Sequence, residues 1–352
     1  MNSREKLLKQ LGIAHPIVQA PMAGVSTPQL AAAVTNSGAL GSLGIGASTA
    51  AQAREMIEQT QALTSGPFNV NVFCHQPARR DAEMEAGWVK HLAPLFAEAG
   101  IEPPDSLSEI YTSFVEDDET LQVLLELKPA VVSFHFGIPS ADRIAALKGA
   151  GVYIMATATS PREAKEIEAA GIDAIVAQGI EAGGHRGIFD PEATDEGLST
   201  LTLVRLLARQ TTLPIIAAGG IMDGFAMKAA LASGAAAVQI GTAFVLCPES
   251  AANEAYRAAL KSERASETRL TKVLSGRPAR GIVNRLISLG ETNQSPPPAD
   301  YPIAYDATKR LNAAASKHGN HEFAAQWAGQ GAPLARELPA ADLIAVILEE
   351  NV

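Results

Sequence analysis

The sequence predicts an α/β fold of the (β/α)8 TIM-barrel class with a C-terminal helical extension. First, eight short apolar runs alternate with Ala-rich helical runs from the N-terminus to about residue 262. Second, these runs are apolar nearly throughout, as expected for parallel strands that helices cover on both faces. Third, most of them follow one another at about the length of one βα unit. Eight such units in series are enough to close a barrel.

The expected strands, in chain order, cover residues 16–20, 40–43, 68–73, 130–135, 152–156, 174–178, 214–218 and 237–241. Helix starts lie between them, since Thr27-Pro28 and Ser160-Pro161 each place a capping hydroxyl before a proline at the first helical position. A doubly wound open sheet is the rival fold. The segment QAPMAGVSTP after the first strand lacks its G-x-G-x-x-G fingerprint, which favours the barrel.

The βα pattern does not run through the whole chain. Residues 1–262 are expected to form the barrel domain, which carries an insertion at about 74–128 after the third strand. Residues 263–352 break the pattern and contain a Pro-rich turn and Ala-rich helical runs. We therefore expect them to form a mostly helical extension packed on the barrel.

Composition excludes several classes of protein. The chain has 352 residues, 47% hydrophobic and 19% charged, so it can bury a large core. Its net charge of −10 argues against nucleic acid or an anionic membrane as the partner. Two cysteines, Cys74 and Cys247, are too few for a disulfide scaffold, and no apolar leader is visible, so a cytoplasmic location is expected. The pattern does not specify an oligomeric state.

Neither a metal site nor a membrane span is expected. No H-E-x-x-H motif and no pair of C-x-x-C motifs occurs in the sequence. Residues 229–247 lack charges, but they include glycines and polar residues, and we interpret them as a helix end, a turn and a buried strand.

The loops after the last two barrel strands often bind phosphate in this fold class. Gly219 and Gly220 follow the seventh strand, and Gly241 and Thr242 follow the eighth. Their small side chains let amide N–H groups approach an anion, and Thr242 adds a hydroxyl donor. Glycines that only make tight turns are the alternative. Both flavin enzymes and non-redox barrels bind phosphate, so this feature alone does not name the ligand.

Amide side chains stand at other strand ends. Asn71 and Gln178 belong to the third and sixth strands, and Gln239 belongs to the eighth. An amide suits the edge of an isoalloxazine or another heterocycle, although Asn71 and Gln178 could instead tie strand ends together. Met22, after the first strand, could lie along a flat ring or in the core.

Two histidines are candidates for catalysis. His185 lies in the glycine-rich segment EAGGHRG, where packing does not account for a histidine. It could act as a base or as a cationic hydrogen-bond donor. A histidine on a surface loop is the alternative. His135 ends the fourth strand and either reaches the same pocket or is a core histidine; His75 is a weaker candidate.

The ordered set of motifs resembles the nitronate monooxygenase family, formerly called 2-nitropropane dioxygenases. The resemblance rests on HPIVQAPMAGVSTPQLAAAVTNSGALGSLG, the strand at 68–73, QGIEAGGHRG, PIIAAGGIMDG and AVQIGTAF, and it extends to YPIAYDATKRL and the QWAGQG stretch around Trp327. The VSFHFG and AGGHRG segments are similar to the branch that detoxifies propionate 3-nitronate. Because the family consists of FMN-dependent barrels, the resemblance implies FMN as the cofactor.

Transferred to this sequence, the resemblance implies roles for the residues at the strand ends. The catalytic histidine falls on His185. Residues at the substrate entrance would be Tyr301, Tyr305 and Lys309. Contacts to FMN would come from Met22, Asn71, Gln178, Gly183, Gly219, Gly220, Gln239, Gly241 and Thr242.

The resemblance also implies a reaction. An alkyl nitronate, such as propionate 3-nitronate, would be oxidised by O₂ through an anionic flavosemiquinone to malonate semialdehyde and nitrite or nitrate. A protonated His185 could hold the nitronate, or a neutral one could take the α-proton of a nitroalkane. An FMN-dependent NAD(P)H enoyl-thioester reductase is the nearest alternative, and a non-redox phosphate-ligand barrel is another.

Overall fold

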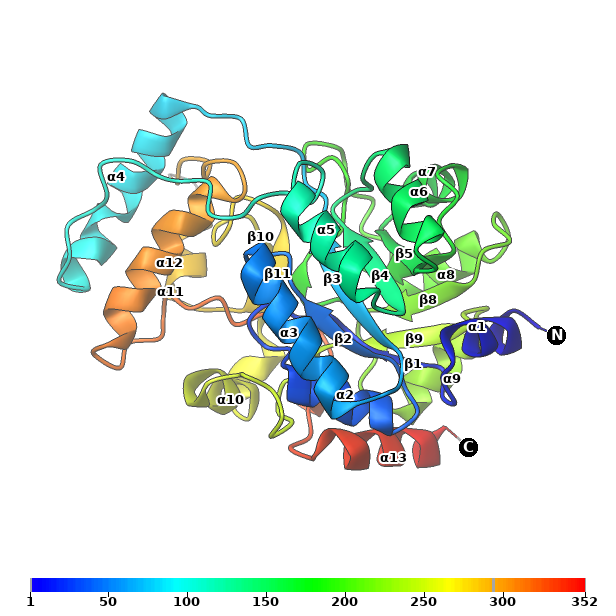
Figure 1. Cartoon of the computed structure of the whole chain (residues 1–352). Coiled ribbons are helices and arrows are strands. Elements are labelled where there is room, and N and C mark those ends of the chain that lie inside the picture. Colours follow the sequence, from blue (N-terminus) through cyan, green and yellow to red (C-terminus); the bar gives the residue numbers. More distant parts are fainter. Residues whose placement is uncertain (1, 293–294, 352) are drawn as a thin grey trace.

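The computed structural model describes residues 2–292 and 295–351, and its centre is a closed barrel of eight parallel strands (Figure 1). These strands are β1 (Ile17–Gln19), β2 (Gly41–Gly44), β3 (Phe68–Phe73), β4 (Val131–His135), β5 (Tyr153–Ala158), β6 (Ala174–Gln178), β8 (Ile215–Ala218) and β9 (Ala237–Ile240). They follow the order β1-β9-β8-β6-β5-β4-β3-β2. A parallel bridge between Val18 and Leu40 joins β1 to β2 and closes the ring. The predicted barrel is confirmed.

Helices surround the strands in the order that the βα pattern predicts. The outer ring contains α2 (Pro28–Asn36), α3 (Ala50–Leu63), α5 (Asp118–Leu127), α6 (Ala141–Gly149), α7 (Pro161–Ala169), α8 (Thr200–Leu207) and α9 (Gly224–Ala232). The Thr27 side chain accepts a hydrogen bond from the Leu30 amide, and the Ser160 side chain accepts one from the Glu163 amide. Both predicted caps therefore form, each with proline at the start of the helix.

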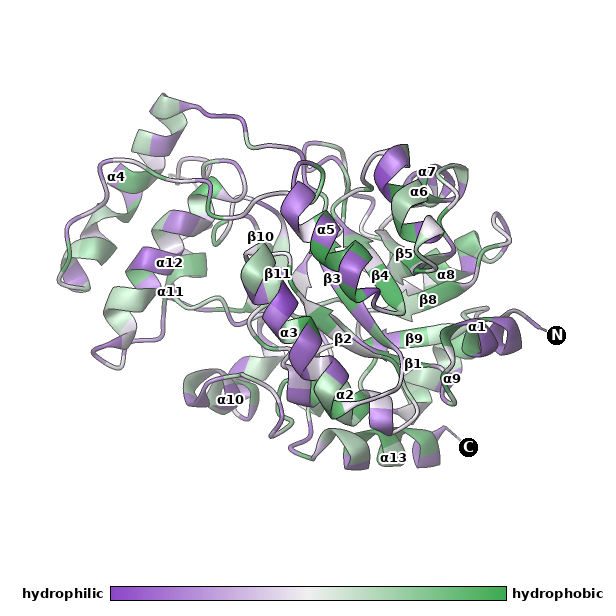
Figure 2. Ribbon diagram, in the orientation of Figure 1, coloured by the Kyte–Doolittle hydropathy of each residue, from purple (hydrophilic) through white to green (hydrophobic). Residues whose placement is uncertain are grey.

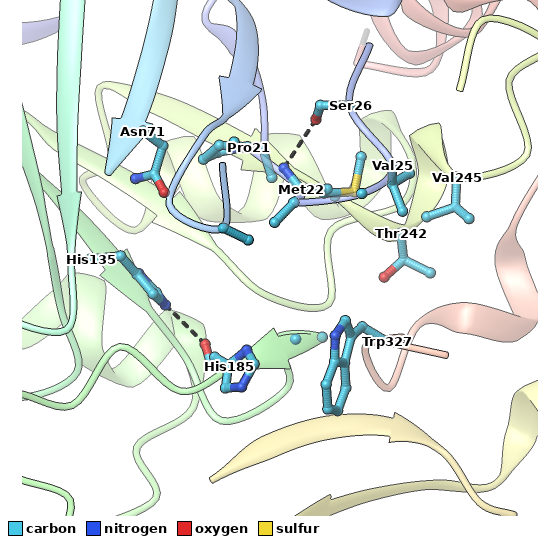
Figure 3. Close-up of a pocket in the computed structure, with 18 of the residues that line it drawn as sticks. Pro21, Met22, Val25, Ser26, Asn71, His135, His185, Thr242, Val245 and Trp327 are labelled. Atoms are coloured by element: carbon cyan, nitrogen blue, oxygen red, sulfur yellow. Dashed lines mark hydrogen bonds between the residues drawn. The ribbon is translucent and has the colours of Figure 1, made fainter. Parts of the chain in front are cut away.

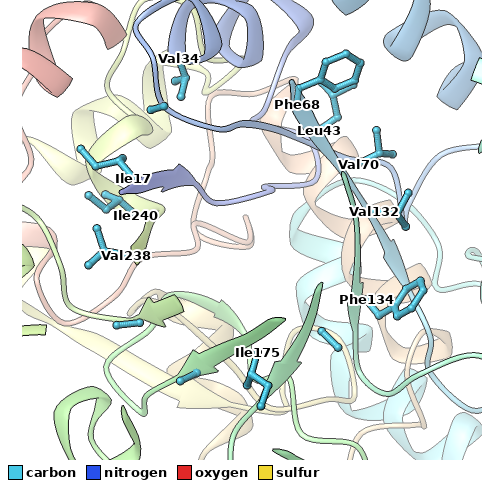
Figure 4. Close-up of a cluster of buried hydrophobic side chains, with 14 of the residues drawn as sticks. Ile17, Val34, Leu43, Phe68, Val70, Val132, Phe134, Ile175, Val238 and Ile240 are labelled. Carbon is cyan, nitrogen blue, oxygen red and sulfur yellow. The ribbon is translucent and has the colours of Figure 1, made fainter. Parts of the chain in front are cut away.

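The core lies between the strands and these helices. Ile17, Val238 and Ile240 project from neighbouring strands toward the helices, as Figure 4 shows, and all three are fully buried. Figure 2 shows the same pattern over the whole fold, with hydrophobic residues on the strands and polar residues on outer helix faces such as that of α3. Each fully buried aliphatic side chain of this kind contributes about 1.5–3 kcal/mol through loss of contact with water.

One end of the barrel is closed. Helix α1 (Ser3–Leu11) places Leu7 and Leu11 in a buried cluster with Val18 and Leu40 of the barrel. Tight packing at the amino-terminal ends of the strands leaves the carboxyl ends as the place for a ligand, as in barrel enzymes in general.

The eighth position in the helical ring is filled from the C-terminus. The chain after β9 forms a short 3₁₀ helix (Thr242–Phe244) and α10 (Glu254–Leu260), but neither packs between α9 and α2. Helix α13 (Ala340–Glu350) contacts both α9 and α2 and lies beside them in Figure 1. Its buried side chains, among them Leu343 and Ile347, belong to the main barrel core. The last segment of the chain thus completes the barrel.

The segment expected to be mostly helical also contains strands. Helices α11 (Arg285–Gly290) and α12 (Ile303–Ser316) are present, but β10 (Thr268–Thr271) and β11 (Ala279–Ile282) form an antiparallel pair before them. A third strand, β7 (Gly184–His185), joins this sheet from the loop after β6. The sequence pattern did not indicate these strands, because β7 has only two residues and β11 pairs with it across a long separation in the chain.

The insertion after β3 is shorter than expected. Its helix α4 (Ala82–Glu98) leaves the barrel and packs on α12, where Trp88, Phe96 and Leu311 share a second core. Helix α5 contacts α3 and α6, so it is a member of the ring. The extra material therefore ends before Asp118. No helix within residues 2–292 and 295–351 combines the length and the apolar character needed to cross a membrane.

Candidate active site

A cavity of about 860 Å³ opens at the carboxyl ends of the barrel strands. The structure brings together on its wall the residues that the sequence marked for cofactor binding or catalysis, apart from the weaker candidate His75. They are Met22, Asn71, His135, Gln178, Gly183, His185, Gly219, Gly220, Gln239, Gly241 and Thr242. Figure 3 shows several of them on opposite sides of the cavity. Their convergence follows from the barrel, because the carboxyl ends of all parallel strands meet at one rim.

The loops after β8 and β9 present amides without partners. Within the described residues, the N–H groups of Gly219, Gly220, Gly241 and Thr242 donate no hydrogen bond to the protein. Gly219 and Gly220 have φ angles of 123° and 69°, which favour glycine, and they turn the chain sharply after β8. These residues are half-buried, and amides that face a cavity without a protein acceptor can bind an anion such as a phosphate group.

Thr242 adds a hydroxyl to this group of amides. Its Oγ1 accepts a hydrogen bond of 3.1 Å from the Gly329 N–H. Since that bond uses a lone pair, the hydroxyl proton is left to donate toward the cavity. Figure 3 shows the Thr242 oxygen directed into the site. The four amides and this hydroxyl fit a phosphate group.

Glycines also allow the C-terminal segment to approach the loop after β6. A Cβ on Gly183 would lie 2.5 Å from the Gly329 nitrogen, and one on Gly329 would lie 2.7 Å from the Glu181 oxygen. Neither position therefore admits a larger residue without movement of the backbone. This contact carries Trp327 to the edge of the cavity beside His185, as Figure 3 shows.

The three amide side chains are used differently. Asn71 donates from Nδ2 to the backbone oxygen and the hydroxyl of Ser133, at 3.1 and 2.9 Å, which leaves its Oδ1 as an acceptor. Gln239 has no protein partner within the described residues and faces the cavity. Gln178 donates from Nε2 to the His185 oxygen at 3.0 Å and accepts at Oε1 from the Gly187 N–H at 2.7 Å. Both ends of its amide thus hold the loop that carries His185.

Met22 lies on the wall opposite His185 (Figure 3). Its backbone N–H donates to the Ser26 hydroxyl at 3.0 Å, and that hydroxyl also accepts from Nε2 of Gln19 at 2.9 Å. These bonds fix the loop after β1. A flat ring between Met22 and His185 would be covered on both faces.

His185 stands among aromatic side chains. Its ring centroid lies 5.1 Å from that of Trp327, 5.3 Å from Tyr301 and 5.5 Å from Phe136. Burial lowers the pKa of His185 to about 3, and the nearby His135 adds to the effect. The imidazole is therefore neutral at neutral pH, which argues against a cationic donor and leaves the ring in the form that can accept a proton.

His135 has no free ring nitrogen. Its Nε2 lies 3.1 Å from the His185 backbone oxygen and its Nδ1 lies 3.0 Å from the Thr157 hydroxyl. A carbonyl only accepts, so Nε2 carries the proton and Nδ1 accepts from Thr157. Burial lowers the pKa of His135 to about 4, so it too is neutral. His135 lines the cavity, but both of its ring nitrogens are used in these bonds, and the bond from Nε2 fixes the backbone of His185.

The cavity wall also contains residues that the sequence indicated only through the family resemblance or did not indicate at all. Tyr301, Tyr305 and Lys309 line the cavity, as the resemblance implied, and Tyr111 joins them from the insertion after β3. The Lys309 nitrogen lies 4.9 Å from the centre of the Tyr111 ring. Tyr111 had no signal in the sequence, because it lies in a loop without regular structure between α4 and α5.

His75 and the two cysteines do not reach the cavity wall. His75 is buried, and neither of its ring nitrogens has a hydrogen-bond partner within the described residues. Cys74 is buried, and burial raises the pKa of its thiol far above the ordinary value. Burial also raises the pKa of Cys247 to about 12, so neither thiol is a nucleophile near neutral pH.

Comparison with known proteins identifies the family. The family model for nitronate monooxygenase matches residues 4–350. A curated nitronate monooxygenase of Pseudomonas aeruginosa is 57% identical over 346 residues, covering 98% of this chain and 99% of that protein. One of Paraburkholderia phytofirmans is 59% identical over 347 residues, covering 99% of this chain and 95% of that protein.

Solved structures agree with the fold and the family. A nitroalkane oxidase from Streptomyces ansochromogenes matches with a TM-score of 0.89 and 41% identity, over 98% of this chain and 97% of that one. FabK from Thermotoga maritima matches with a TM-score of 0.74 and 29% identity, over 98% and 95% of the two chains. This chain therefore belongs to the nitronate monooxygenase family of flavin-dependent oxidoreductases.

Proposed function

We propose that the protein binds FMN and uses O₂ to oxidise alkyl nitronates, with propionate 3-nitronate as the substrate it fits best. The products would be malonate semialdehyde and nitrite or nitrate. The observation that carries the proposal is the pairing of two features in one cavity. Four unpartnered amides stand on one part of its wall, and a neutral histidine with aromatic neighbours stands on another.

The residues present fit FMN. The amides of Gly219, Gly220, Gly241 and Thr242 would hold the phosphate, since they lack acceptors within the described residues. The free oxygen of Asn71 and the amide of Gln239 would receive polar atoms of the ring or of the ribityl chain. When bound, the flavin accepts electrons from the nitronate and passes them to oxygen.

The cavity also contains a group suited to the carboxylate of propionate 3-nitronate. Lys309 is the only lysine or arginine on the cavity wall within residues 2–292 and 295–351. It pairs with no carboxylate there, and contacts the faces of Tyr111 and Tyr305 instead. Desolvation lowers its pKa somewhat, but an ammonium near a carboxylate keeps its proton. A substrate with a carboxylate would therefore bind better than an uncharged nitronate.

Neutral His185 would perform the proton chemistry. A nitronate is already a carbanion equivalent and needs no base. A neutral nitroalkane needs one, and an imidazole without a proton on the nitrogen facing the cavity can remove the α-proton. His135 and Gln178 would keep the imidazole in place, since both donate to its backbone oxygen.

The test uses the purified protein with its bound cofactor. We expect a yellow protein that releases FMN on denaturation and consumes O₂ when propionate 3-nitronate is added. Under anaerobic conditions, the nitronate should change the visible flavin spectrum and NADPH should not. A flavin reduced by NADPH alone would support the enoyl-thioester reductase instead, and a colourless protein that does not take up FMN would support a non-redox barrel.

A further inference from the structure

Ser275 contacts the imidazole of His185. It is fully buried in the connection between β10 and β11, and its Oγ is 2.9 Å from Nε2 of His185. The β7–β11 pairing places His185 opposite Ala279 and so fixes the imidazole against this connection. A Cβ on Gly276 would lie 2.3 Å from the Ala299 oxygen, so the connection is also packed closely on its far side.

The Ser275 hydroxyl has one proton and two possible acceptors. Its Oγ lies 3.1 Å from the backbone oxygen of Arg277 as well as 2.9 Å from His185 Nε2. Within the described residues, the Arg277 oxygen receives no other hydrogen bond. A buried carbonyl without a donor is costly, whereas His185 can supply its own proton to the shared contact. The arrangement that satisfies all three groups has Ser275 donating to Arg277 and accepting from His185.

We propose that Ser275 is a positioning residue that holds neutral His185 in the Nε2–H tautomer and leaves Nδ1 as a proton acceptor facing the cavity. Within the described residues, the hydrogen bond of the His185 ring is made by Nε2 and none by Nδ1, and His185 lines the cavity. The kinetic consequence rests on the proposed function. The Nδ1 lone pair takes the α-proton of a neutral nitroalkane, the C–H electron pair stays on the substrate as the nitronate, and the proton remains on the imidazole. A ready-made nitronate gains nothing from this nitrogen.

The tautomer can be measured without any activity assay. In protein labelled with ¹⁵N-histidine, His185 is assigned by the loss of its signals in His185→Asn. We expect two-bond ¹H–¹⁵N correlations of the Nε2–H form in the wild type and a shift toward the Nδ1–H form in Ser275→Ala. Ser113→Ala is the matched control, because Ser113 is also buried and bonds to the nearby His75 backbone but does not contact His185.

Kinetics provide the second measurement. Ser275→Ala should lower turnover of a neutral nitroalkane at least about tenfold and leave turnover of propionate 3-nitronate within about twofold. An Nδ1–H wild type, or an unchanged tautomer in Ser275→Ala, would overturn the proposal. Equal losses with both substrates would also overturn it, because they would indicate general damage to the site. If wild-type protein oxidised neither substrate, the proposed function would fail while the tautomer measurement still decided the role of Ser275.

Discussion

The backbone oxygen of His185 accepts a hydrogen bond of 3.1 Å from Nε2 of His135 (Figure 3). His135, at the end of a barrel strand, thus fixes the main chain of His185. The segment around His185 is rich in glycine, so its backbone is flexible without such a bond. The bond leaves the His185 ring free to face the cavity. Both histidines are neutral because burial lowers the pKa of each, although this bond by itself acts to raise the pKa of His135.

Replacement of His185 should separate the two substrate classes. In His185→Asn, turnover of neutral nitroalkanes should fall by roughly 10²–10⁴-fold, because general base catalysis is lost. Turnover of propionate 3-nitronate should fall much less, because that substrate needs no base. Oxygen consumption with each substrate measures both values, and the FMN content of the variant shows whether the site is intact. Full retention of turnover with both substrates would remove His185 from the mechanism.

Lys309 should set the preference for a carboxylate-bearing substrate. In Lys309→Met, we expect the KM for propionate 3-nitronate to rise about tenfold, which corresponds to about 1.4 kcal/mol for a charge-assisted hydrogen bond. The KM for ethyl nitronate, which has no carboxylate, should not change. Lys317→Met, at the end of the same helix, is the control. An equal rise for both nitronates would argue against a contact with the carboxylate.

Gly220 should matter for FMN more than for folding. Gly220→Ala places a side chain at φ 69° and 3.2 Å from the Glu181 Cβ, beside the unpartnered amides. FMN should bind at least about tenfold more weakly, because the amides move away from the phosphate position. Gly171→Ala has the same kind of backbone, at φ +74°, but open space around it and no contact with the cavity. It should lose about 1–2 kcal/mol of stability and keep its FMN affinity, as measured by flavin fluorescence.

Acid should destabilise the protein through its buried histidines. His185 has a folded pKa of about 3, and His135 and His75 have values of about 4, all below the ordinary 6.5. Above pH 6.5 the folded and unfolded chains are both neutral at these positions, so they contribute no pH dependence. Below it the unfolded chain takes up protons first, and stability falls until the folded pKa values are reached. The charge of buried Arg277 near all three groups adds to this effect.

Thermal unfolding between pH 7 and pH 4 measures this dependence. His185→Asn should lose less stability over that range than the wild type does. His318→Gln, at an exposed position, should follow the wild-type curve. Parallel curves for the wild type and His185→Asn would show that His185 does not have a lowered pKa.

Helix α13 should be required for a stable barrel. Leu343 is fully buried in the main core, so Leu343→Ala should cost about 2–5 kcal/mol of unfolding free energy. Leu334 is 57% exposed, and Leu334→Ala should cost less than about 0.5 kcal/mol. Chemical denaturation measures both. Similar small losses would mean that α13 is only loosely attached to the ring.

The sequence specified the barrel because its signals are local. Apolar runs of strand length, a capping hydroxyl before proline at Thr27 and Ser160, and one βα period are each contained in a short segment. The closed ring then forces Asn71, Gln178, Gly219 and the other strand-end residues to one rim. Fold class and the location of the candidate site therefore follow from the order of the residues.

The finer arrangement depended on contacts between distant segments. The pairing of β7 with β11, the use of α13 as the eighth outer helix and the hydrogen bond between Ser275 and His185 each join residues far apart in the chain. No local pattern encodes such a pairing, because its energy comes from burial and from partners that meet only after the barrel has closed. The sequence by itself determined which strand ends meet at the cavity. Only the tertiary structure decided that His185 is buried, and therefore neutral, and that hydrogen bonds from distant segments fix its ring and its backbone.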